Sequence, residues 1–103
     1  MALTTARRRE LRQYKNLVIK IFEAHVDLIG SDWRRKLHPL ETLDIESHEN
    51  CPAARVTGLP WGKAMLALKV NVGAFGKEVR GFFAANAEEQ GYVNELWRKE
   101  AQK

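Results

Sequence analysis

Residues 11–28 read LRQYKNLVIKIFEAHVDL, and their apolar side chains recur at alternating steps of three and four. This period places them on one side of an α-helix and the polar residues on the other. Thr4 or Thr5 can cap the N-terminus of that helix and Gly30 can end it, so we predict a helix that runs to about Ile29. Its predicted buried face consists of Leu11, Tyr14, Leu17, Val18, Ile21, Phe22, His25, Leu28 and Ile29.

The width of this face indicates which kind of partner the helix has. The steps of three and four last for fewer than three heptads, and Leu17, Phe22 and Ile29 widen the face beyond a two-position seam. Both observations favour a helix of a small bundle over a strand of a coiled coil.

Residues 61–83 carry two competing periods. Leu66, Leu68, Val70 and Val72 alternate as the side chains of a β-strand would. A helical period accounts for more residues, so we predict a second long amphipathic helix here and keep the strand as the alternative. Each interior glycine costs such a helix about 0.5–1 kcal/mol relative to alanine. The helical face, which we expect to pack against the first helix, consists of Trp61, Met65, Leu68, Val72, Phe75, Val79, Phe82 and Phe83.

The remaining segments are shorter or less regular. We predict a short basic helix from Trp33 to about His38, capped by Ser31 or Asp32 and ended by Pro39. Residues 39–60 are acidic and irregular, with one or two short strands possible around 43–45 and 56. Asn86 can cap a last helix over 87–101, with Val93, Leu96 and Trp97 on its buried edge. This last helix has the weakest pattern of the long ones.

These segments predict the fold class. We expect a mainly α protein: a small helical bundle in a single domain, residues 1–103, with two long amphipathic helices and an irregular acidic middle segment. The alternative is an α+β arrangement of a helix, two or three short antiparallel strands and a helix.

Charge is segregated along the chain. The net charge of +4 divides into +5 over residues 1–36, −3 over 37–60 and +2 over 61–103. Basic residues near a helix N-terminus oppose the helix dipole, and this local cost favours a functional role for them. Lysine and arginine bind phosphates, and an exposed tryptophan can stack on a base, whereas Trp61 and Trp97 fit the core better. The candidate nucleic-acid-binding residues are Arg7, Arg8, Arg9, Arg12, Lys15, Trp33, Arg34, Arg35 and Lys36.

Metal and catalytic chemistry have weaker support. His48 and Cys51 have the spacing of two zinc ligands, and His38 or His25 could complete a site, but a second close pair is missing. We expect His25 to be hydrogen-bonded at the edge of the core. Cys51 with a histidine, or the carboxylates of 41–49, could serve catalysis only if the fold held them together. No nucleophile elbow, P-loop or dinucleotide fingerprint is present, so we predict no enzyme, cofactor or metal.

The sequence therefore predicts a small basic, non-enzymatic binding module, a regulatory or accessory protein that contacts nucleic acid through its basic N-terminal helix. The alternative is a protein–protein interaction module, an adaptor or inhibitor that binds an acidic protein surface. A homodimer is compatible with both, because long amphipathic helices expose apolar edges. One cysteine, no secretory signal and no membrane-spanning apolar run predict a cytoplasmic protein without membrane contact.

Overall fold

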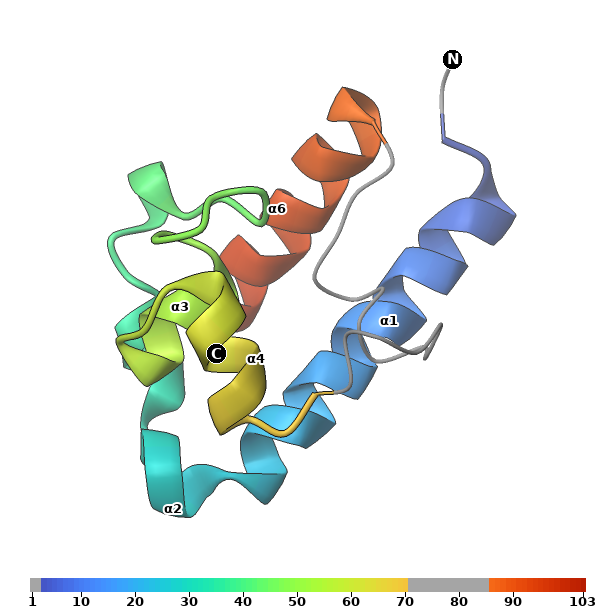
Figure 1. Ribbon diagram of the computed structural model, residues 1–103. Coiled ribbons are helices and arrows are strands. Elements are labelled where there is room, and N and C mark those ends of the chain that lie inside the picture. Colours follow the sequence, from blue (N-terminus) through green and yellow to red (C-terminus); the bar gives the residue numbers. More distant parts are fainter. Residues whose placement is uncertain (1–2, 71–85) are drawn as a thin grey trace.

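Helices provide the regular secondary structure of this protein in the computed structural model (Figure 1), which describes residues 3–70 and 86–103. No β-strand occurs in these ranges, so the mainly α prediction is confirmed there and the strands proposed around 43–45 and 56 are wrong. The elements are α1 (Thr5–Ala24), α2 (Val26–Ile29), the 3-10 helices η1 (Trp33–Leu37) and η2 (Leu40–Thr42), α3 (Pro52–Thr57), α4 (Trp61–Ala67) and α6 (Ala87–Ala101).

Helix α1 begins as predicted but ends earlier. The Thr4 side chain accepts a hydrogen bond from the backbone N–H of Arg7 at 3.1 Å, which caps the first turn. At His25 the backbone leaves helical geometry, with φ −120° and ψ 27°, so the predicted helix to Ile29 is divided into α1 and α2. Leu28, predicted to be buried, is therefore 55% exposed. His25 Nδ1 lies 2.8 Å from the carbonyl oxygen of Ile21, which agrees with the predicted position at the edge of the core.

The turn after α2 requires glycine. Gly30 has a φ of +90°, and a Cβ added there would lie 2.8 Å from the side-chain oxygen of Asp32. Its backbone N–H donates to the carbonyl of Val26 and closes α2. The predicted helix stop at Gly30 is thus correct, although it ends the short helix rather than the long one.

The predicted long helix over 61–83 is wrong as a continuous element. Helix α4 ends at Ala67, and Lys69 then adopts a left-handed φ of 58°, which a continuing α-helix does not allow. The strand alternative also fails for 66–70, because Leu66 is helical and 77% exposed. The rest of the predicted face, Val72, Phe75, Val79, Phe82 and Phe83, lies outside the described residues.

Helix α6, which has the weakest sequence pattern, is the long helix that packs along α1 (Figure 1). The Asn86 side chain accepts a hydrogen bond from the backbone N–H of Glu89 at 2.9 Å, so the predicted cap is confirmed. Val93 and Trp97 are buried as expected, and Leu96 is half-buried. The two helices run in the same direction, from the upper right of Figure 1 to the lower left.

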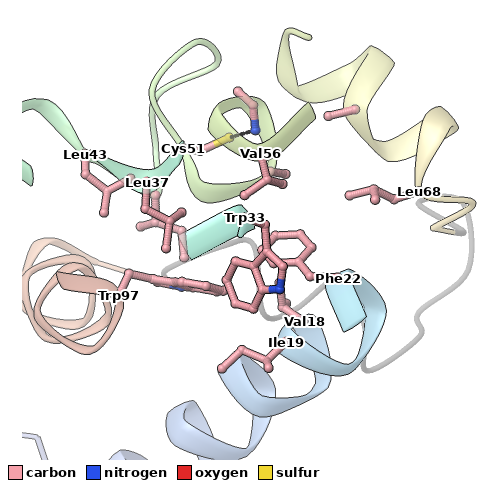
Figure 2. Close-up of a cluster of buried hydrophobic side chains, with 14 of the residues drawn as sticks. Val18, Ile19, Phe22, Trp33, Leu37, Leu43, Cys51, Val56, Leu68 and Trp97 are labelled. Atoms are coloured by element: carbon pink, nitrogen blue, oxygen red, sulfur yellow. Dashed lines mark hydrogen bonds between the residues drawn. The ribbon is translucent and has the colours of Figure 1, made fainter. Parts of the chain in front are cut away.

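An aromatic cluster forms the centre of the core between these helices (Figure 2). The Phe22 ring lies 5.2 Å from the Trp33 ring and 5.8 Å from the Trp97 ring, measured between centroids. Trp33 and Trp97 are each 1% exposed. Val56 of α3 is buried against this cluster. It lies in a helix, whereas the sequence allowed a short strand there. Aromatic rings at these separations contribute their large buried areas and a favourable ring geometry.

Arg55, the one arginine or lysine of residues 37–60, connects the parts of the acidic middle segment. The Arg55 guanidinium donates to the carbonyl oxygens of Leu37 and Pro39 at 2.7 and 2.9 Å, and to the side chains of Thr42 and Asn50 at 2.6 and 3.2 Å. These hydrogen bonds join η1, η2 and the loop before α3. Satisfied backbone carbonyls allow a segment without strands to pack tightly against the core.

Replacing the buried indole tests this core. We expect Trp33→Ala to lower the free energy of unfolding by about 3–5 kcal/mol, because it removes a large side chain from a packed interior. Leu66→Ala is the control, since an exposed side chain changes stability by less than about 0.5 kcal/mol. Urea unfolding followed by circular dichroism measures both. A loss below about 1 kcal/mol for Trp33→Ala would show that the indole is not part of the core.

Candidate nucleic-acid interface

The structure divides the nine candidate residues by what they contact. Some are paired with buried carboxylates of α6, some contact a tyrosine or a backbone carbonyl, and others are exposed and form no hydrogen bond or ion pair with the described residues. The residues paired with carboxylates are Arg7, Lys15 and Arg34. Those that contact a tyrosine or a carbonyl are Arg8, Arg12 and Lys36. The third group is Arg9 and Arg35, and Trp33 belongs to the core.

Arg7 joins the first turns of α1 and α6. Its Nε and Nη2 atoms donate to the two carboxylate oxygens of Glu89 at 2.8 and 2.9 Å, which is the bidentate geometry of a strong ion pair. The Glu89 side chain is 7% exposed, and Arg7 also contacts Glu10. The hydrogen bond from Arg7 to Glu89 outweighs burial and raises the pKa of Arg7. Arg7 is therefore a structural residue in this fold.

Glu100 connects three elements through one buried carboxylate. It is 2% exposed and accepts from Lys15 of α1 at 3.1 Å and from Arg34 of η1 at 2.9 Å, while Lys103 lies 3.2 Å away. Burial by itself raises the pKa of Glu100, but the hydrogen bonds from Arg34, Lys15 and Lys103 outweigh it, so this pKa is lower than its ordinary value. Lys15 and Arg34 thus stabilise a buried charge.

Trp33 cannot stack on a base in this structure, so its proposed role is wrong. The indole is 1% exposed, and the guanidinium of Arg34 lies 4.3 Å from its ring centroid. Helix η1 has five residues and buries Trp33 and Leu37. A helix this short does not show a clear hydrophobic period in the sequence. Trp97 is in the core as expected, and Trp61 is half-buried and packs against the core.

Lys36 and Arg35 complete the second basic cluster. The Nζ atom of Lys36 donates to the carbonyl oxygen of Ile29 at 2.7 Å, where it stabilises the C-terminal end of α2. Arg35 is exposed. With Arg34 paired to Glu100, most of this cluster has contacts within the fold.

Exposed positive charge remains on α1, from the edge that contacts α6 round to the outer face. Arg8, Arg9, Arg12 and Lys20 are all exposed, and their positions fall within an arc of about 120° around the helix. Arg12 donates to the hydroxyl of Tyr92 at 3.0 Å, and the Arg8 guanidinium lies 5.8 Å from the centre of the same ring. We call Arg8, Arg9, Arg12 and Lys20 the α1 stripe. Clustering in the sequence did not identify Lys20, but the helical period places it on this face.

The histidine and cysteine residues considered as metal ligands do not form a cluster in the described part of the chain. No group of three or more histidine, cysteine, aspartate or glutamate side chains is close enough there to hold a metal ion. Cys51 is 1% exposed, and its Sγ accepts from the backbone N–H of Ala54 at 3.4 Å as the cap of α3. Burial raises the pKa of this thiol. Over the same residues, no helix has the length and apolarity needed to cross a bilayer.

Comparison with protein-family models, curated proteins and solved structures gave no match for this chain.

Neutralising Glu100 tests whether its ion pairs with Lys15 and Arg34 stabilise the fold. We expect Glu100→Gln to lower the free energy of unfolding by about 1–3 kcal/mol, because Lys15 and Arg34 lose their anionic partner. The loss is smaller than for a fully enclosed pair, since Arg34 is 33% exposed. Glu95→Gln is the matched control: its pair with Arg98 spans 3.8 Å at the surface, and we expect a change below about 0.5 kcal/mol. Equal effects of the two changes would contradict a structural role for Glu100.

The difference in stability between the wild type and Glu100→Gln should depend on pH. Because the pKa of Glu100 is lowered in the fold, its charge stabilises the protein above the ordinary value of 4.5, and this contribution is lost as pH falls through the lower folded pKa. A protonated glutamate resembles glutamine, so the stability difference between the wild type and Glu100→Gln should be constant near neutral pH and shrink below 4.5. Urea titrations across this pH range measure it. A difference that grows on acidification would reverse the assigned direction.

Proposed function

We propose that this protein is a non-enzymatic nucleic-acid-binding module that places the outer face of α1 along a duplex. The α1 stripe carries the proposal, because its cations remain exposed after the ion pairs with α6 are formed. Glu10 is the one carboxylate in residues 8–20, and it pairs with Arg7 away from the stripe. Phosphates would therefore meet a surface that is mainly positive from Arg8 to Lys20, with the exposed carboxylate of Glu23 one turn beyond it.

The length of the α1 stripe fits several phosphates. From Arg8 to Lys20 the helix rises about 18 Å at 1.5 Å per residue. A duplex rises about 3.4 Å per nucleotide of each strand, so this length corresponds to about five base pairs. A contact with several phosphates of the duplex would suit a regulatory or accessory protein that binds nucleic acid without catalysis.

The aromatic residues favour a duplex over single strands. Single-strand binding commonly uses exposed aromatic rings on which bases stack. In the ranges that the structure describes, every aromatic side chain is buried or half-buried; the set is Tyr14, Phe22, Trp33, Trp61, Tyr92 and Trp97. Phosphate contacts by arginine and lysine do not need unstacked bases.

A protein–protein interaction module is the second candidate. Leu66 is 77% exposed and Leu28 is 55% exposed. A trough of about 430 Å³ lies beside the C-terminal half of α1 and includes Ile21, Leu68 and Val70. Exposed leucines and an apolar trough are features of surfaces that bind a protein or a second copy of the chain. The trough adjoins the end of the α1 stripe, because Lys20 borders both.

Salt-dependent binding tests the proposed function. We expect the affinity for a duplex of about 20 base pairs to fall steeply between about 50 and 200 mM salt, as counterion release requires. Arg9→Gln/Arg12→Gln should weaken binding and reduce the log–log salt slope by about 2, because each phosphate contact contributes about 0.9. Fluorescence anisotropy gives both quantities.

The matched control is Lys63→Gln/Lys99→Gln, which removes the same charge from exposed positions on α4 and α6. We expect the slope of this variant to stay close to that of the wild type. Equal losses for the two variants would show that net charge alone drives binding, and absence of binding at low salt would reject the proposal.

A further inference from the structure

We propose that Gln13 and Asn16 of α1 read base edges in the major groove of duplex DNA. This inference rests on the proposed function and adds sequence selectivity to it. The α1 stripe would hold the phosphates, and the two amides between its cations would contact the bases.

The two amides lie in the middle of the basic surface. Gln13 and Asn16 are three residues apart, so they are neighbours on one side of the helix. Arg9 and Arg12 precede them and Lys20 follows, and together these five side chains occupy an arc of about 100°. All five are exposed. A helix laid in a groove with phosphates at both ends would therefore direct both amides toward the base pairs.

Neither amide has a hydrogen bond within the described residues, in contrast to most of the others. Asn86 caps α6, Asn50 accepts from Arg55, Gln90 donates to Asp44, and the Asn94 side chain accepts from the backbone N–H of Ile45 at 2.8 Å. Those amides organise the fold. Gln13 and Asn16 are exposed on α1 and keep their donors and acceptors available for a ligand.

The chemistry of the amide group identifies the ligand. Asparagine and glutamine present one acceptor and one donor side by side, which matches N6 and N7 of adenine in the major groove. The major groove of B-DNA is about 12 Å wide and admits an α-helix. The major groove of A-form RNA is too deep and narrow for side chains to read. Duplex DNA is therefore the partner that fits this face.

A hollow with both polar and apolar walls adjoins the amides. A hollow of about 630 Å³ is bordered by Gln13, Asn16, Lys20, Tyr14, Leu17 and Glu10. Leu17 is half-buried there. Apolar side chains contact the methyl group of thymine, so an adenine–thymine pair would find both a polar and an apolar partner on this side of α1.

Enrichment from a random duplex DNA pool tests the inference. We expect the wild type to select a short motif that contains adenine and to prefer it at least about tenfold over a scrambled duplex. Gln13→Ala/Asn16→Ala should bind random duplex with an unchanged salt slope but lose most of this preference, because the phosphate contacts remain. Gln102→Ala, which removes an exposed amide from the C-terminus, is the control and should keep the motif.

The outcomes separate this inference from the proposed function. If the wild type binds all duplex DNA equally, or if Gln13→Ala/Asn16→Ala selects the same motif, base reading by these amides is wrong while duplex binding stands. A duplex RNA of the selected sequence should show no preference over a scrambled RNA, and an equal preference would overturn the major-groove contact. No binding to any duplex would reject both proposals.

Discussion

Two buried carboxylates on α6 constrain the arrangement of this protein. Glu89 and Glu100 are 6% and 2% exposed, and a carboxylate removed from water is costly unless cations and hydrogen bonds surround it. Arg7 pairs with Glu89 near the first turns of both helices, and Lys15 pairs with Glu100 farther along. Because the earlier residue of α1 pairs with the earlier residue of α6, and the later with the later, the two pairs require α1 and α6 to run parallel. They also determine which face of each helix is turned toward the other. The aromatic cluster of Phe22, Trp33 and Trp97 then fills the space that these helices and η1 enclose.

The same pairs give the basic residues of α1 different roles. A cluster of arginines at a helix N-terminus is unfavourable for the helix dipole, and Arg7 and Lys15 are explained by their partners in α6. Arg9 has no such partner in the described residues, and Arg8 and Arg12 contact the exposed edge of α6 at Tyr92. The inner edge of α1 thus stabilises the fold, and the outer face is available to an anion. Gln13 and Asn16 lie on that available face.

The sequence predicted those features that depend on residues close together in the chain. The caps formed by Thr4 and Asn86 involve residues three positions away. Asn86 was predicted as a cap, and Thr4 was one of the two residues predicted for the first helix. The partner of α1 was not predictable from its apolar stripe, because the choice of α6 depends on ion pairs between residues more than 80 positions apart. The predicted helix over 61–83 is interrupted after Ala67, and Lys69 then takes a positive φ that no local sequence signal marks. For the candidate site, clustering of charge selected Arg7, Lys15 and Arg34, whose partners are distant in sequence, and omitted the uncharged amides of the outer face.

We propose that α1 packs against α6 with one face and binds a duplex with another. Chemical-shift mapping by NMR, in which isotopically labelled protein is titrated with duplex DNA, distinguishes the two faces. We expect the largest shifts at Arg9, Arg12, Gln13, Asn16 and Lys20, while the Nε–Hε signal of Arg7, which is bonded to Glu89, stays in place. A titration that displaces the Arg7 signal and leaves the outer face of α1 unchanged would contradict it.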